Sequence, residues 1–219
     1  MMLFARCVFA SFLCLVLAGA GGCAAVGFVA AAMPPPNIEA AYKDLGNHTV
    51  AVMVWADRTI RIDFENIQPD LAYAVQKRLQ TAAEKDKVEG LANIRWVDAR
   101  RVWAWQQNYP DTEGLPAEEL AKTLKVERLI YIEVNDFQTR AESTVELFRG
   151  SMNVSIRVVE VNGAEAKISF ADENINAVYP PSVPEDGTPK GNDATMYYGT
   201  LQLMSLDVAN RFMKHTEEE

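Results

Sequence analysis

Three carboxylates follow the first apolar segment of the chain, where an enzyme of the α/β class would hold a substrate or a metal ion. Asp57, Asp63 and Glu65 lie in the polar stretch 56–66, which comes directly after the apolar run 49–55. Open α/β sheets bind ligands at the carboxyl ends of their strands. Carboxylates placed there can perform acid–base chemistry or bind Ca²⁺ or Mg²⁺. A carboxylate-dependent hydrolase is therefore one hypothesis for this chain.

The alternative is that these carboxylates have no chemical role. Asp57 can form a turn, and the other two can belong to a solvated surface that also carries Arg58 and Arg61. Nothing else of a catalytic kind comes near them in the sequence, and the stretch has no glycine with which to build a phosphate-binding loop. We therefore predict neither a catalytic residue nor a metal site here.

The histidines and cysteines exclude further kinds of chemistry. His48 precedes the first apolar run and His215 lies near the C-terminus, a placement that predicts neither a triad nor a histidine metal pair. The three cysteines, Cys7, Cys14 and Cys23, all lie in or beside the N-terminal leader. The folded body therefore has no cysteine for a disulfide, a thiolate metal site or a nucleophile. We expect a non-enzymatic protein without a cofactor.

Two tryptophans indicate binding instead. Trp103 and Trp105 are two residues apart in a short segment with helical spacing, so they cannot face the same way. One should pack inward, while the other stays partly exposed. An exposed tryptophan is typical of a protein interface, although it can also cover the edge of a sheet. Both readings stay open at this stage.

The N-terminus carries an export signal. Arg6 precedes an uncharged apolar run, residues 7–33, and small residues lead up to Cys23. The segment 17–23 resembles the lipobox of bacterial lipoproteins, in which the signal is cut before the cysteine and that cysteine carries fatty acyl chains. In enteric lipoproteins an aspartate after the cysteine retains the protein in the inner membrane. The alanine found here, Ala24, therefore suggests the outer membrane, with the body facing the periplasm.

Two other readings of the leader stay open. The run 7–33 is long enough for a membrane-spanning anchor, which needs about 20 residues. Ordinary cleavage after residues 30–32 is the third possibility. In every case the body is exported. We divide the chain into a signal peptide at 1–22, an acylated anchor with a triple-proline spacer at 23–37, and one domain at 38–219.

The net charge limits the kinds of partner that the chain can bind. The chain has a net charge of −9. Cleavage of the leader would remove one basic residue, Arg6, and no acidic one, so the net charge of the mature chain would be −10. An acidic body predicts no nucleic-acid partner and no electrostatic adhesion to anionic lipid. Attachment to the membrane would then depend on acyl chains at Cys23.

The elements that must position these residues follow from hydrophobic periodicity. Apolar runs predict central strands at 49–55 and 128–137 and a shorter strand at 93–97. Helical spacing predicts the remaining elements of the first half, with 56–66 as a polar loop. The expected helices are 38–45, 69–86 (with Pro69 at its first position), 98–107 (capped by Asp98) and 116–124.

In the second half of the chain, apolar and polar residues alternate. Residues 151–158 form a strand with one wet face, Asn162-Gly163 predicts a hairpin, and a partner strand from 166 should carry a bulge near 171–173. A long loop at 179–194 leads to an amphipathic helix at 195–214. We therefore predict an α/β sandwich of about five mixed strands with an antiparallel hairpin at one edge. Its buried strand faces should include Val52, Val54, Ile130, Ile132 and Ile156.

A family resemblance rests on the first strand and the segment after it. Residues 50–55, followed by Asp57-Arg-Thr59 and Ile62-Asp63, resemble the LpoB-like lipoproteins, which are outer-membrane activators of peptidoglycan synthases. CsgG-like curli secretion lipoproteins and the N-terminal domain of TolB share this layout. The resemblance is one of pattern over most of residues 48–214, and it extends through residues 94–97, 121–132 and the hairpin at 162–163.

The resemblance implies an accessory, assembly or activator role in the cell envelope. We predict a domain that binds another envelope protein. One alternative is a subunit of a CsgG-like secretion assembly, and the other is the carboxylate-dependent hydrolase. The predicted partner-binding residues are Asp57, Arg58, Thr59, Asp63, Trp103 and Trp105.

Overall fold

The computed structural model describes residues 37–86, 88–142, 146–182 and 184–216. The chain divides into two compact units, one formed by 1–38 with 216–219 and the other by 39–215. In the first unit, the described residues are the short strand β1 (Asn37–Ile38) and Thr216, the second residue of β7 (His215–Thr216). The predicted leader and lipobox lie outside the described residues, and so does the triple proline at 34–36. All that follows concerns the second unit.

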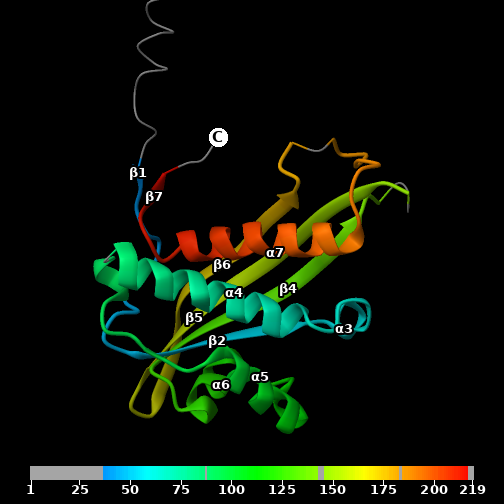
Figure 1. Cartoon of the computed structure of the whole chain (residues 1–219). Coiled ribbons are helices and arrows are strands. Elements are labelled where there is room, and N and C mark those ends of the chain that lie inside the picture. Colours follow the sequence, from blue (N-terminus) through cyan, green and yellow to red (C-terminus); the bar gives the residue numbers. More distant parts are fainter. Residues whose placement is uncertain (1–36, 87, 143–145, 183, 217–219) are drawn as a thin grey trace, which may run out of the picture. The chain divides into compact units, whose positions relative to one another are not determined.

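A five-stranded mixed sheet organises the second unit (Figure 1). Its spatial order is β3-β2-β4-β5-β6, where β2 pairs in parallel with both of its neighbours and β4, β5 and β6 form an antiparallel meander. This confirms the predicted α/β architecture with a parallel start and an antiparallel edge. The strands are β2 (Thr49–Ala56), β3 (Arg95–Trp96), β4 (Arg128–Arg140), β5 (Phe148–Asn162) and β6 (Glu165–Tyr179).

Helices cover the two faces of this sheet unequally. The long helices α4 (Ile67–Thr81) and α7 (Asp193–Asn210) lie side by side over one face (Figure 1). The shorter helices α5 (Ala99–Asn108) and α6 (Ala117–Leu124) pack against the opposite face, around β2, the first half of β4 and the hairpin end of β5 and β6. Short helical turns complete the unit: α3 (Arg58–Asp63), η1 (Ala82–Asp86), η2 (Glu89–Leu91) and η3 (Pro110–Thr112).

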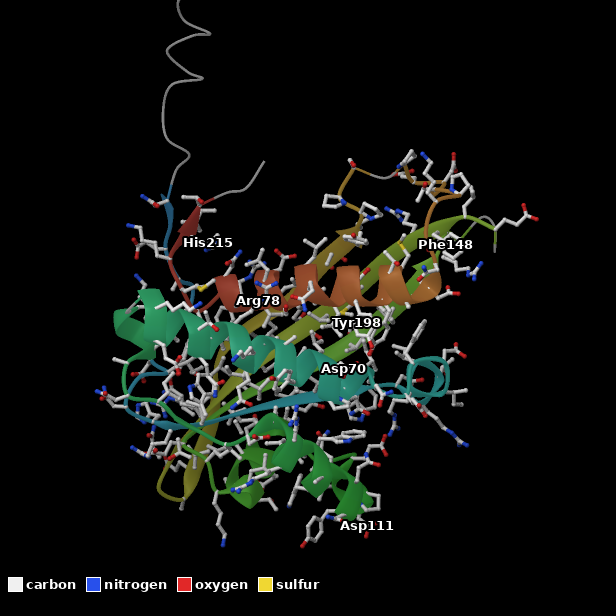
Figure 2. The ribbon with its side chains drawn as sticks, viewed as in Figure 1. Asp70, Arg78, Asp111, Phe148, Tyr198 and His215 are labelled. Atoms are coloured by element: carbon white, nitrogen blue, oxygen red, sulfur yellow. The ribbon has the colours of Figure 1, made fainter. Side chains whose placement is uncertain are left out.

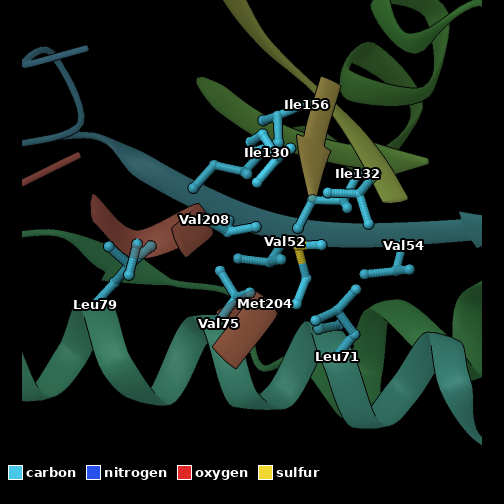
Figure 3. Close-up of a cluster of buried hydrophobic side chains, with 14 of the residues drawn as sticks. Val52, Val54, Leu71, Val75, Leu79, Ile130, Ile132, Ile156, Met204 and Val208 are labelled. Atoms are coloured by element: carbon cyan, nitrogen blue, oxygen red, sulfur yellow. The ribbon is translucent and has the colours of Figure 1, made fainter. Parts of the chain in front are cut away.

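The main core lies between the sheet and the α4–α7 pair (Figure 3). Side chains of β2, β4 and β5 meet Leu71, Val75 and Leu79 of α4 and Met204 and Val208 of α7. Each of these helix residues is buried at helical spacing, as an amphipathic helix requires. The predicted strand residues are all at most 1% exposed, which confirms their placement: Val52, Val54, Ile130, Ile132 and Ile156.

The predicted hairpin forms one residue later than expected. Asn162 pairs with Glu165, so Gly163 and Ala164 make the two-residue loop. Gly163 has φ of +65°, and a glycine with positive φ at the first loop position is typical of a type II′ turn. Downstream, the register of β6 against β5 shifts between Asp172 and Ile175, which confirms the predicted bulge.

The remainder of the second face carries a polar network instead of a helix. Asn153 of β5 donates from Nδ2 to Oδ1 of Asn174 at 2.7 Å and of Asn176 at 2.8 Å on β6. Its own Oδ1 accepts a bond of 2.8 Å from Asn135 of β4. We call these four residues the asparagine network. They satisfy one another across three strands on the wet face that the alternation predicted.

The predicted helix at 38–45 is wrong. Residues 39–45 form no helix, because their groups bond to distant parts of the chain instead. The N–H of Tyr42 donates to the Arg211 carbonyl at 2.9 Å, and its hydroxyl donates to Glu160 at 2.9 Å. Tyr42 and Leu45 are both buried, so tertiary packing fixes an irregular segment whose spacing resembles a helix.

The polar stretch 56–66 is not a loop either, because it contains α3. Ile60 and Phe64, four residues apart, both pack on the main core, while Ile62 between them is 72% exposed. These contacts follow helical spacing, which the alternation of Ile60, Ile62 and Phe64 in the sequence does not reveal. α4 then begins at Ile67, which is fully buried, two residues before Pro69.

Candidate functional site

Asp57 has a structural role as the cap of α3. Its Oδ1 accepts a hydrogen bond of 2.8 Å from the Thr59 N–H, as an N-cap aspartate does. That bond lowers the pKa of the exposed Asp57 carboxyl. The cap satisfies a free N–H at the start of the helix, so its carboxylate already has a structural task.

The other two carboxylates of this stretch do not gather with Asp57. Asp63 is the last residue of α3 and Glu65 follows it, and both are exposed. In the described ranges no three His, Cys, Asp or Glu side chains lie close enough together to hold a metal ion. Arg58 and Thr59 are exposed on α3 as well. Four of the predicted partner-binding residues thus share one short helix and its cap.

An ion pair joins α3 to a segment far along the chain. The guanidinium of Arg61 donates to Oε1 of Glu113, which follows the turn η3. Both side chains are partly exposed, at 31% and 43%. Both residues line the outer, partly exposed side of a small cavity beside the carboxyl end of β2, the position at which α/β sheets bind ligands.

The cavity has a volume of about 120 Å³. Its inner wall is buried, because Met53, Gln68 and Leu120 are each at most 4% exposed. Burial also raises the pKa of Tyr131, which lines the same space, to about 12, so its hydroxyl stays neutral. The remaining lining residues are Trp55, Arg61, Gln106, Gln107, Tyr109, Pro110, Thr112 and Glu113.

Three polar atoms of the lining residues have no hydrogen-bond partner in the protein. They are Nε1 of Trp55, Nε of Arg61 and Oε1 of Gln68, and all three are buried. The amide of Gln68 is oriented by its nitrogen, which donates to the Val54 carbonyl at 2.8 Å. A carbonyl can only accept, so it is the oxygen of Gln68 that is left without a partner. Unpartnered buried polar atoms are rare and costly, and the residues that carry these three all line one cavity.

The two tryptophans of α5 differ in their packing, although both are partly buried. Trp105 packs against the smaller core cluster around Val102 and Leu120, and its ring lies 5.5 Å from that of Tyr109. Trp103 belongs to neither core cluster of the described part of the chain. Trp105 therefore supports the cavity rim through Tyr109, whereas Trp103 does not line the cavity.

Sequence reasoning missed the cavity itself. Trp55, Arg61 and Gln68 come from a strand and two successive helices, and no spacing rule links them to Glu113. Only the position of the polar stretch after a strand pointed to this end of the sheet. Cys23, the predicted lipidation site, lies outside the described residues. Within the part that the structure describes, no helix has the length and apolar character needed to cross a membrane.

A second hollow runs between α4 and α7. It has a volume of about 480 Å³, and Asp70, Arg78 and Tyr198 are among the residues that line it (Figure 2). Arg78 bridges the helices through Ser205 at 2.7 Å and the Gln202 carbonyl at 2.9 Å. These bonds occupy the guanidinium, so the hollow is a groove crossed by a structural contact.

Comparison with known proteins gives only weak similarity. No family model and no curated protein sequence matches the chain. Among solved structures it is similar to the PelC dodecamer from Paraburkholderia phytofirmans, with 9% identity and a TM-score of 0.44 over 83% of this chain and 99% of that one. It is also similar to lipoprotein GNA1162 from Neisseria meningitidis, with 13% identity and a TM-score of 0.40 over 68% and 89%. It is similar as well to the hypothetical protein CT253 from Chlamydia trachomatis, with 17% identity and a TM-score of 0.40 over 74% of this chain and 96% of that one. Similarity at this level carries no argument about function.

Proposed function

We propose that this chain is a non-enzymatic lipoprotein of the bacterial cell envelope whose folded domain binds another envelope protein. The anchor would be Cys23, at the end of the small-residue run of the leader, and the outer membrane would be its location. An accessory, assembly or activator role fits such a module. The argument for binding rests on the surface around the cavity mouth.

The observation that carries this proposal is the exposure of apolar side chains on the two segments that the Arg61–Glu113 pair joins. Seven large hydrophobic residues are exposed in the described ranges, and three of them lie on these segments. Ile62 of α3 is 72% exposed, Tyr109 is 55% exposed and Leu115 is 40% exposed. Aromatic and aliphatic side chains at a polar rim are typical of a protein interface.

The chemistry of the site favours binding over hydrolysis. Asp57 already caps α3, and the carboxylates near it are spread along an exposed helix. The CsgG-like alternative gains no specific support, because the apolar residues of β5 (Met152, Val154, Ile156 and Val158) are buried in the main core. A partner-binding surface at α3 and residues 109–115 would instead use side chains that the fold leaves exposed, namely Ile62, Tyr109 and Leu115.

A matched pair of tyrosine variants tests the proposal. Tyr109→Ala and Tyr198→Ala remove the same atoms from side chains of similar exposure, 55% and 60%, on different surfaces. Partner capture from envelope extracts by the full acylated chain should weaken about thirtyfold for Tyr109→Ala, the effect of about 2 kcal/mol at an interface. Tyr198→Ala should capture as the unaltered chain does.

Two results would contradict the proposal. Equal capture by both variants, or a loss confined to Tyr198→Ala, would move the interface away from the cavity mouth. A hydrolytic activity that disappears in Asp57→Asn or Asp63→Asn would make the chain an enzyme. Asp57→Asn is a fair test because asparagine caps a helix as well as aspartate does, so α3 should persist.

A further inference from the structure

The three unpartnered atoms define what the cavity can bind. Seven buried side-chain nitrogen or oxygen atoms lack a partner in the described part of the chain, and three of them belong to residues lining this one space. Nε1 of Trp55 and Nε of Arg61 are donors, and Oε1 of Gln68 is an acceptor. A complementary group must accept hydrogen bonds from the two donors and donate a hydrogen bond to the acceptor.

Charge selects among such groups. Arg61 is the cationic residue of the lining, and Glu113 already neutralises it. An anion would gain little from this pair, and it would also face Oε1 of Gln68, which carries a partial negative charge. A ketone or ester would satisfy the donors and leave the acceptor unpaired. A carboxamide satisfies all three, because its oxygen accepts and its nitrogen donates, and a hydroxyl also does so, because its oxygen accepts twice and its O–H donates.

Size narrows the group further. An engineered cavity of about 150 Å³ holds a benzene molecule, which has six heavy atoms. The 120 Å³ available here suits about five heavy atoms. A glutamine side chain beyond its Cα has five and an asparagine side chain has four. Of the hydroxyl side chains, serine and threonine have only two and three heavy atoms beyond Cα and tyrosine has eight, so the volume favours a carboxamide over a hydroxyl. The cavity therefore matches the end of one side chain rather than a free metabolite of ordinary size.

Entry requires only a small change at the mouth. The inner wall is buried, whereas Arg61 and Glu113 are partly exposed. A surface ion pair of this kind is weak and can open at little cost. Parting of the two side chains would widen the outer side of the cavity and free the Arg61 guanidinium for a group that arrives from outside.

We propose that the cavity bounded by Trp55, Arg61 and Gln68 is a recognition pocket for a primary carboxamide, the side chain of a glutamine or asparagine on the partner protein. This inference rests on the proposed protein-binding function and adds the chemistry that the partner must present. The pocket would set specificity, since a partner with an apolar or acidic residue at that point would leave buried polar atoms unpaired.

Small probes can test the pocket without the partner. Propionamide reproduces the glutamine side chain, butanone has the same shape without the donor, and propionate carries a charge. N-methylacetamide reproduces a peptide bond or an acetamido sugar. The chain has four tryptophans, so the indole N–H signals of the full chain in detergent can be assigned by Trp→Phe variants. The indole signal of Trp55 reports binding.

We expect propionamide to shift the Trp55 signal saturably, with a dissociation constant on the order of millimolar for so few atoms. Butanone and propionate should bind about tenfold more weakly, because each leaves a buried polar atom unsatisfied. Tighter binding of N-methylacetamide than of propionamide would overturn the assignment, as would equal binding of all four probes. No saturable shift would show that the pocket holds water only.

A matched pair of glutamine variants completes the test. Gln68→Met removes the acceptor from the cavity, and it should lower propionamide affinity about tenfold with butanone binding unchanged. Gln76→Met alters another buried glutamine of α4, which bonds to Val97 and Ala99 away from the cavity, and it should bind both probes normally. An equal loss in both variants would show a general effect on folding and overturn the pocket.

The two proposals fail separately. Probe binding measures the pocket alone, and Tyr109→Ala measures partner capture. If propionamide does not bind while capture depends on Tyr109, the carboxamide inference is wrong and the binding surface stands. If propionamide binds while capture ignores Tyr109, the proposed interface is wrong.

Discussion

Shortening Ile132 to alanine tests the sheet at its centre. Ile132 is fully buried in β4, and its cross-strand neighbours are Val54 on β2 and Ile156 on β5. Both neighbours are also buried, and the hydrogen-bonded strands that carry them cannot collapse into the space left behind. We therefore expect the upper part of the usual range for such a change, about 3–5 kcal/mol of unfolding free energy. A domain of ordinary stability, about 5–15 kcal/mol, would be badly weakened.

Urea unfolding of the chain from residue 37 onward measures this loss. With a slope of about 2 kcal/mol per molar urea, the midpoint should fall by about 1.5–2.5 M. Ile168→Ala removes the same atoms from β6, where the side chain is 42% exposed, and it should cost under about 1 kcal/mol. Equal losses for the two variants would refute the placement of Ile132 in the core.

Three further predictions concern the anchor, the packing of α7 and the response to acid. Cys23→Ala should abolish acylation and release the protein from the membrane fraction while the domain stays folded; mass spectrometry of the N-terminus that finds unmodified Cys23 in the unaltered protein would contradict this. Gly199→Ala should destabilise the fold by about 1–3 kcal/mol in urea, because the new Cβ would lie 2.4 Å from the ring of Tyr179. Hydrogen bonding to Arg140 holds the pKa of Asp193 below its usual value, so the pair stabilises the fold above about pH 4 and this contribution disappears as the pH falls through the lowered pKa. The difference in unfolding free energy between the unaltered chain and Asp193→Asn should therefore shrink towards pH 3, and a difference that stays constant with pH would show that the charge plays no part.

Sequence reasoning placed the elements whose periodicity matches their packing. The run 49–55 is apolar on both faces because α4 covers one face of β2 and α5 covers the other, so a covered strand could be recognised directly. The alternation in 151–158 likewise reflects one buried and one wet face. In both segments the local pattern and the tertiary environment agree, which is why the five-stranded architecture could be predicted.

The misses come from residues whose role is set by distant contacts. Tyr42 lies in a segment with helical spacing, yet its N–H donates to the carbonyl of Arg211 just after α7, and its hydroxyl donates to Glu160 of β5. Both partners are more than a hundred residues away. The cavity was invisible for the same reason, since Arg61 and Glu113 meet only after α3 and η3 are in place. Asp57 was recognised as a turn former, and its capping bond to Thr59 is the local event that the sequence could indicate.

The asparagine network has a consequence for how the strands β4, β5 and β6 find their alignment. A slip of one residue in β5 would move Met152, Val154 and Ile156 into water and carry Asn153 into the apolar core. The same slip would separate Asn153 from its partners on both neighbouring strands, breaking bonds of 2.7–2.8 Å on each side. Each face of the strand therefore specifies the same alignment independently. Long hairpins with one solvent-exposed face are prone to mispairing, and here the asparagine amides of that face fix the strand register a second time.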